Sequence, residues 1–179
     1  MRSQHGATLL EILVTLVLTA IGLLGMASIQ ARSINDNYDA AANSRAMFLV
    51  TDLAERMRAN MPGVWAGSYQ RNSMSGSLVS SGADCRASDC TAATMASFDL
   101  AEWFNSRLRV ELPDADATIT SLTGGWSPTY TAASGSIEQA PLQVRIRLRW
   151  KALSSGDCNS AGTDADDGGY RCMETTIGL

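Results

Sequence analysis

The chain has 179 residues, enough for one compact domain with an N-terminal extension and too few for two full domains. Apolar residues make up 45% of the sequence, as in a globular protein, but they gather in a dense block near the start. The net charge of -4 argues against a general nucleic-acid-binding protein, because nonspecific affinity for phosphates comes mainly from Lys and Arg.

The apolar block is residues 12–31, ILVTLVLTAIGLLGMASIQA, which carries no charge and follows Glu11 directly. As a helix it would span about 30 Å, the thickness of a bilayer core. A secretory signal peptide would have a basic start, a shorter apolar core and then a small-residue cleavage site, and here these features are out of order. A plain membrane anchor has no need for the acid at its edge, which costs about 2.5 kcal/mol or more in hydrocarbon. We therefore expect a membrane helix in which Glu11 has a specific task.

The segment GATLLE, residues 6–11, resembles the prepilin motif: a glycine, usually phenylalanine, then Ser or Thr, two aliphatic residues and a glutamate. In that family a prepilin peptidase cuts after the glycine on the cytoplasmic side and methylates the new terminus. The resemblance implies that residues 1–6 are a leader, that cleavage follows Gly6 and that Ala7 becomes N-methylated, although Ala7 departs from the usual phenylalanine.

This processing gives a physical reason for a charged residue at position 11. An acid among packed apolar helices needs a cationic partner, and cleavage creates an α-amino group about one turn away, at Ala7. In pilins this glutamate is thought to meet the terminus of a neighbouring subunit and to set axial register. The resemblance carries that role to Glu11 and Ala7.

From Ser33 onward the helical pattern becomes one-sided. Its expected buried face comprises Ile34, Tyr38, Ala42, Ala46, Leu49, Leu53 and Met57, and the acids Asp36, Asp39, Asp52 and Glu55 lie on other faces. We expect the helix to reach about Met61 and to be ended by Pro62-Gly63. Its first half, residues 7–31, would lie in the membrane or the filament core, and the head would comprise residues 32–179.

The remaining elements are shorter. Residues 63–96, rich in Gly, Ser, Ala and Asn, predict a surface connection. The D-x-x-E box formed by Asp99 and Glu102 predicts the start of a second helix, which Pro113 follows. Strands are expected at ATITSL (117–122), more weakly at 126–133, most clearly at 143–151, and in the ending YRCMETTIGL (170–179).

Four cysteines, Cys85, Cys90, Cys158 and Cys172, all lie beyond the apolar block. An even number in flexible segments indicates two disulfides, formed in the periplasm or outside the cell. Zinc is the alternative, but paired CxxC knuckles are absent and no histidine lies near. Proximity favours the pairs Cys85–Cys90 and Cys158–Cys172, while other connectivities stay open.

The sequence offers little for catalysis. Its only histidine, His5, lies in the leader that would be removed, so we expect no enzyme and no cofactor. Asp164, Asp166 and Asp167 are a weak candidate for calcium, although their spacing does not match an EF-hand loop. The row Arg145, Arg147, Arg149 and Lys151 is a weak candidate for nucleic acid, since no aromatic residues interleave with the charges and the outer face of a sheet explains them.

The leader, the amphipathic extension, the helix DLAEWFNSRLRVELP and the terminal strands together resemble the PilV-type minor pilins of type IV pili. The resemblance implies an α+β fold, with a long N-terminal helix packed on a small antiparallel sheet in a C-terminal globular head. It also implies a subunit of the bacterial inner membrane, with its head in the periplasm, that helps to initiate pilus assembly and enters the pilus at low copy number, at the tip. The implied partners are other minor pilins, the major pilin, the prepilin peptidase, the inner-membrane assembly platform and, before assembly, inner-membrane lipid. The alternatives are a minor pseudopilin of a type II secretion system and a DNA-binding or adhesive tip pilin.

Overall fold

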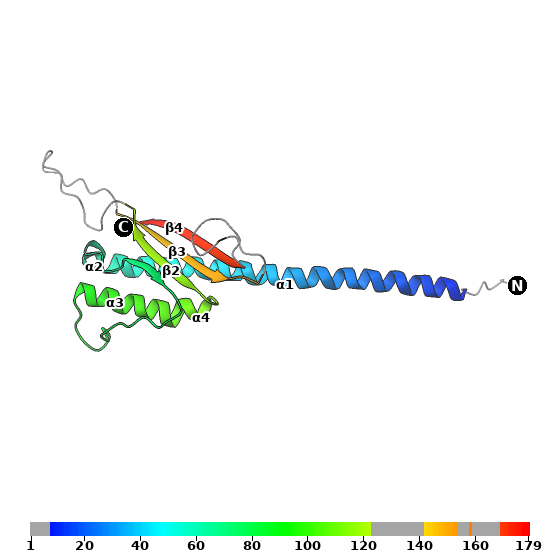
Figure 1. Cartoon of the computed structure of the whole chain (residues 1–179), viewed down its shortest axis with the longest axis horizontal. Coiled ribbons are helices and arrows are strands. Elements are labelled where there is room, and N and C mark those ends of the chain that lie inside the picture. The colour runs from blue at the N-terminus through cyan, green and yellow to red at the C-terminus, as the bar shows by residue number, and fades with distance from the viewer. Residues whose placement is uncertain (1–7, 123–141, 154–157, 159–168) are drawn as a thin grey trace, which may run out of the picture. The chain divides into compact units, whose positions relative to one another are not determined.

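A computed structural model of the chain describes residues 8–122, 142–153, 158 and 169–179 (Figure 1). The chain forms two compact units, Met1–Tyr38 and Asp39–Leu179, and the long helix α1 (Leu9–Ala59) contributes to both. The predicted limits of the leader, the membrane segment and the head, at 6/7 and 31/32, stay predictions. Within the first unit, every described residue from Thr8 to Tyr38 is exposed.

In the second unit, α1 presents one buried face, as the spacing predicted from Ala42 onward. Five predicted residues are at most 2% exposed, namely Ala42, Ala46, Leu49, Leu53 and Met57. Ile34 and Tyr38, which belong to the first unit, are 67% and 37% exposed. The expected outward position of Asp39 is wrong, because this acid is only 2% exposed.

Pro62-Gly63 does not end the long helix. α1 stops at Ala59, and Asn60 caps a separate short helix, α2 (Met61–Trp65), by accepting a hydrogen bond from the Gly63 N–H. Pro62 lies in the first turn of α2, where the missing N–H of proline is not needed. The proline therefore belongs to the start of the next helix.

The second long helical segment begins earlier than the D-x-x-E box predicted. Helix α3 (Ala92–Glu102) is capped by Thr91, whose hydroxyl accepts a hydrogen bond from the Thr94 N–H at 3.2 Å. It continues as a π-helix, η1 (Trp103–Leu108), and a final turn, α4 (Arg109–Glu111). Asp99 lies inside α3, so the predicted capping role of its side chain is wrong.

Four antiparallel strands form one sheet in the order β1-β2-β3-β4, with β1 (Arg71–Met74), β2 (Asp116–Ser121), β3 (Gln143–Lys151) and β4 (Tyr170–Gly178). The three clear strand predictions are confirmed, and the alternation along β3 buries its apolar residues fully. β1 falls in the predicted surface connection, which is a correction to that expectation. The weak strand predicted at 126–133 lies outside the described residues.

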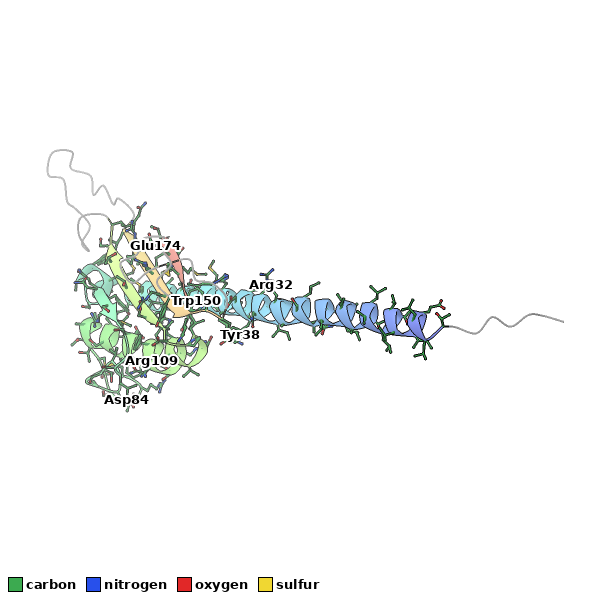
Figure 2. The ribbon with its side chains drawn as sticks, turned by 45° about the vertical axis from the view of Figure 1, so that its right-hand side comes forward. Arg32, Tyr38, Asp84, Arg109, Trp150 and Glu174 are labelled. Atoms are coloured by element: carbon green, nitrogen blue, oxygen red, sulfur yellow. A yellow bond between two sulfur atoms is a disulfide. The ribbon has the colours of Figure 1, made fainter. Side chains whose placement is uncertain are left out.

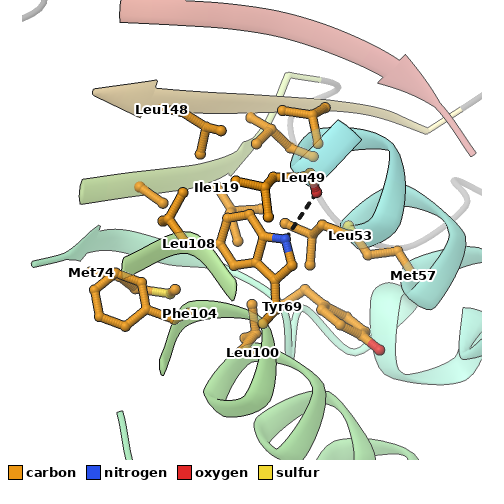
Figure 3. Close-up of a cluster of buried hydrophobic side chains, with 14 of the residues drawn as sticks. Leu49, Leu53, Met57, Tyr69, Met74, Leu100, Phe104, Leu108, Ile119 and Leu148 are labelled. Atoms are coloured by element: carbon orange, nitrogen blue, oxygen red, sulfur yellow. Dashed lines mark hydrogen bonds between the residues drawn. The ribbon is translucent and has the colours of Figure 1, made fainter. Parts of the chain in front are cut away.

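The core fills the space between α1, the α3–η1 helix and one face of the sheet (Figure 3). Its largest side chains include Trp103, Trp150, Tyr69 and Phe104, all fully buried. The indole N–H of Trp103 donates to the carbonyl oxygen of Leu49 in α1 at 2.9 Å, which fixes the two helices against each other. The α+β class is confirmed: a long N-terminal helix with a small antiparallel sheet in a C-terminal head.

Candidate functional site

The apolar part of α1 has an unusual surface for a soluble protein (Figure 2). Its large apolar side chains are 47% to 85% exposed, namely Leu9, Leu10, Ile12, Leu13, Val14, Leu16, Val17, Leu18, Ile21, Leu23, Leu24, Met26 and Ile29. The helix is long and apolar enough to cross a membrane. An apolar surface of this extent marks a contact with lipid or with other proteins, because soluble proteins rarely expose one.

The helix start explains part of the motif around Glu11. The Glu11 N–H lies 3.3 Å from the hydroxyl oxygen of Thr8 and donates to the Thr8 carbonyl oxygen at 3.0 Å. Thr8 is therefore a capping residue, and Glu11 stands in the first turn, where the positive end of the helix favours a carboxylate. The motif analysis missed this role of Thr8, although T-x-x-E is a capping-box pattern. Gly6 and Ala7 lie outside the described residues.

The predicted basic row on β3 is closely paired with acids and an aromatic ring. Arg145 pairs with Glu174 at 3.1 Å, and Arg149 pairs with Asp116 at 2.6 Å. The Arg149 guanidinium also lies 4.4 Å from the centre of the Tyr170 ring. The remaining members of the row are Arg147, which lies 3.5 Å from the sulfur of Cys172, and Lys151, which is exposed at the end of β3. Cross-strand pairing within the sheet accounts for most of this row.

Both disulfides favoured by proximity are present: Cys85 is bonded to Cys90, and Cys158 is bonded to Cys172. Cys158 is 4% exposed and its backbone N–H donates to the Tyr170 carbonyl at 3.3 Å, so the second disulfide lies along β4. The calcium candidates Asp164, Asp166 and Asp167 lie outside the described residues. Within the described part of the chain, no three His, Cys, Asp or Glu side chains gather as a metal site would require.

A buried polar network joins α1, α3 and the segment between them. The Tyr69 hydroxyl donates to Asp99 at 2.6 Å, and the Asn60 amide lies 3.2 Å from the same hydroxyl. Arg56 lies 3.6 Å from Asp99 and 3.4 Å from Glu102. Burial raises the pKa of Asp99 despite these partners, and burial together with the bond to Asp99 raises the pKa of Tyr69. The network fixes the helices, and Tyr69 and Asn60 were not found from the sequence because their partners lie far along the chain.

A second buried acid, Asp39, ties α1 to the end of the sheet. It accepts a hydrogen bond from the Leu153 N–H at 3.2 Å and lies 3.7 Å from the Arg171 guanidinium of β4. Both polar clusters join elements of the head to one another.

Comparison with known families agrees with the two parts of the chain. The prokaryotic N-terminal methylation motif matches residues 1–27, and the family described as type IV pilin Tt1218 matches residues 28–101. No curated protein and no solved structure matches the chain. The two matched ranges adjoin, so they cover the apolar helix, its amphipathic continuation and the head as far as α3.

Proposed function

Since the chain is a type IV pilin, with a methylation motif at its start and a pilin-family match directly after it, we propose that it is a minor pilin that helps to initiate and promote pilus assembly. One observation carries the proposal: the helix surface over Leu9–Ile29 is apolar and exposed on all sides, and its one acid, Glu11, lies in the first turn. Such a surface can be buried in lipid before assembly and among similar helices afterwards. The pilin family is structural, and we propose no catalytic activity for this member.

Membership in this family implies processing by a prepilin peptidase and assembly with other pilins. For this chain we propose cleavage after Gly6 and N-methylation of Ala7. Residues 7–31 would then lie in the inner membrane, with the head, residues 32–179, in the periplasm. Both disulfides support that side of the membrane, because such bonds persist in oxidising compartments.

The mechanism is association of subunits. The apolar helix would leave lipid and pack among the helices of the major pilin and other minor pilins, delivered by the inner-membrane assembly platform. Glu11 would pair with the α-amino group of a neighbouring Ala7, which makes its burial acceptable and sets axial register. The resemblance of the helix around Leu100 and of the disulfide-closed end to PilV-type minor pilins favours a minor subunit over a major one. That resemblance alone leads us to propose a low copy number and a place at the tip.

Quantitative mass spectrometry of sheared filaments tests this proposal. We expect a mature N-terminus at Ala7 with one added methyl group, both disulfides, and far fewer copies than the major pilin. A mature protein that begins at Met1, or absence from the filaments and from their membrane precursors, would overturn it. A deletion strain separates the nearest alternative: loss of pili supports the minor pilin, whereas loss of type II secretion with normal piliation identifies a pseudopilin.

A further inference from the structure

Residues 75–90, which we call the strap, lead from the end of β1 to the capping residue of α3. None of these residues is buried. Within the part of the chain that the structure describes, the backbone N–H groups of Ser77, Arg86 and Ala87 donate to other strap residues, and only that of Val79 donates to the rest of the head. A segment with so little burial depends on a few specific contacts to stay in place.

One of these contacts joins Val79 of the strap to Asn105 of η1. The Val79 N–H donates to the Asn105 side-chain oxygen at 3.0 Å, and the Asn105 amide donates to the Val79 carbonyl at 2.7 Å. The amide therefore pairs with the backbone of one residue in both directions. Val79 is also partly buried against the core. This contact fixes the first part of the strap.

The second contact is made by Arg86, near the end of the strap. Its guanidinium pairs with Glu102 and lies 5.4 Å from the centre of the Phe98 ring. Phe98 and Glu102 are four residues apart, so they share one face of α3. The Arg86 side chain is 67% exposed, and an ion pair this exposed stabilises little by itself. The strap therefore needs a further constraint to keep Arg86 at α3.

A hollow lies between the strap and the helix. Its volume is about 240 Å³, and the strap side is lined by Val79, Ser81 and Arg86. Phe98 and Asn105 are among the residues that line the helix side. Because the strap does not fill the space beneath it, it gains few packing contacts there. The strap is therefore an element of low local stability on a well-packed helix.

The Cys85–Cys90 disulfide supplies the constraint. It holds the two Cα atoms 5.6 Å apart, and Thr91, which caps α3, follows Cys90 directly. Without the bond, the same Cα atoms could move to about 17 Å apart, because an extended chain spans about 3.4 Å per residue. A shorter tether raises the effective concentration of Arg86 at its partners on α3. The disulfide therefore favours the docked strap.

The same disulfide is within reach of a reductant. Cys85 and Cys90 are partly exposed and the four residues between them are exposed, whereas Cys158 of the other disulfide is 4% exposed. A dithiol reduces such a bond in two steps: one thiolate attacks a sulfur to form a mixed disulfide, and the second thiol then displaces the protein. The dithiol leaves as a disulfide, and its two electrons and two protons remain on Cys85 and Cys90 as two thiols.

We propose that Cys85 and Cys90 form a redox switch for the strap. The disulfide keeps the strap docked on α3 and η1, and reduction by a dithiol releases it and uncovers the helix face at Phe98 and Asn105. The inference goes beyond the proposed function, because it concerns the surface that the head presents and not the entry of the chain into filaments. The coupling is reciprocal: a change that undocks the strap must also make the disulfide easier to reduce.

Hydrogen exchange of the full chain in detergent tests the switch, at increasing ratios of reduced to oxidised dithiothreitol and with each cysteine assigned by differential alkylation. We expect Cys85–Cys90 to be reduced before the other disulfide, and the Val79 N–H then to exchange about fivefold faster or more. The Leu100 N–H, in the middle of α3, should keep its rate because the helix stays folded. The variant C85S/C90S, without reductant, should exchange like the reduced chain.

N105A tests the reciprocal effect, because it removes both bonds to Val79 and leaves the cysteines in place. We expect Cys85–Cys90 to be reduced at a ratio of reduced to oxidised dithiothreitol that is lower than in wild type by about fivefold or more. The control N72A makes the same substitution at an exposed asparagine of β1 and should leave the ratio unchanged. Three results would overturn the inference: a Val79 exchange rate that reduction leaves unchanged, a wild-type ratio in N105A, or reduction of both disulfides together with faster exchange at Leu100.

Discussion

Asp39 is the residue at which the helical pattern and the structure disagree most. Charged residues on an amphipathic helix usually face water, which is why the pattern placed this acid outward. It is instead 2% exposed, because it receives the Leu153 N–H and pairs with Arg171 from the far end of the chain. Only the tertiary structure supplies these partners.

We expect D39N to lower the free energy of unfolding by about 1–3 kcal/mol, a range reduced because Arg171 is 28% exposed. The amide keeps an acceptor for the Leu153 N–H but no longer balances the guanidinium. Chemical denaturation of the full chain in detergent measures the change. E55Q, at an acid 64% exposed in its pair with Arg58, is the control and should stay within about 0.5 kcal/mol of wild type. Equal effects of the two substitutions would contradict the prediction.

The raised pKa of Tyr69 predicts that the free energy of unfolding depends on pH. Its pKa in the folded chain is raised above the ordinary 10.0, first by burial and then by its bond to Asp99. Above pH 10 the unfolded chain therefore loses the phenolic proton while the folded chain retains it, and the free energy of unfolding falls as the pH rises. Y69F should lose about 1 kcal/mol near neutral pH and show a shallower alkaline decline. Denaturation midpoints measured from pH 8 upward check this, and an unchanged decline in Y69F would contradict it.

At the scale of elements, the two disulfides differ in what they hold. Cys85 and Cys90 are 5 residues apart, whereas Cys158 and Cys172 are 14 apart and join the edge of β4 to its neighbouring segment. In the chain-entropy model, the short loop contributes about 2 kcal/mol and the long loop about 3 kcal/mol. We expect the C158A/C172A variant to be the less stable of the two double alanine variants. Guanidinium denaturation of both, under identical conditions, decides the order; a reversed order would refute the prediction.

A separate prediction concerns the contribution of the π-helix η1 to the stability of the head. Its first residue, Trp103, is fully buried and donates to the Leu49 carbonyl at 2.9 Å. W103F would remove the donor and part of the buried ring, so we expect a loss of about 2–4 kcal/mol. Denaturation measures the loss. The matched W65F, at a residue 42% exposed in α2, should have a much smaller effect, and a similar loss in both would argue against this role of Trp103.

Elements with a strong period were predictable, and those that depend on distant partners were not. The alternation of β3 and the spacing from Ala42 to Met57 predicted the correct faces. The helix start predicted from the D-x-x-E box at Asp99 was wrong. The Asp99 side chain accepts a hydrogen bond from Tyr69 and pairs with Arg56, and a local pattern does not contain these distant residues. β1 was missed for a related reason: it has four residues, and its pairing with β2 defines it.

At the scale of the whole molecule, the chain combines a unit without a core of its own and a unit with one. From Thr8 to Tyr38 every described residue is exposed, whereas the head buries a continuous cluster of apolar side chains. The methylation motif that matches residues 1–27 could be recognised from the sequence, because the prepilin pattern is local. The sequence did not predict the hollow lined by Met47, Phe48 and Met173, because these residues come together only when the head folds.

Glu11 supplies the prediction that concerns the assembled protein. Removing its charge lowers the cost of placing the helix in lipid, so E11A should insert into the membrane at least as well as wild type. In the filament the same change leaves the α-amino group of a neighbouring subunit without its partner, and we expect about tenfold less incorporation or an even larger loss. Mass spectrometry of membranes and of sheared filaments from the same cells measures both quantities. The control E111A removes an acid of the head that pairs with Arg107 at 3.2 Å and should leave both unchanged. Wild-type levels of E11A in filaments would mean that Glu11 does not set subunit register, whatever its place in the motif.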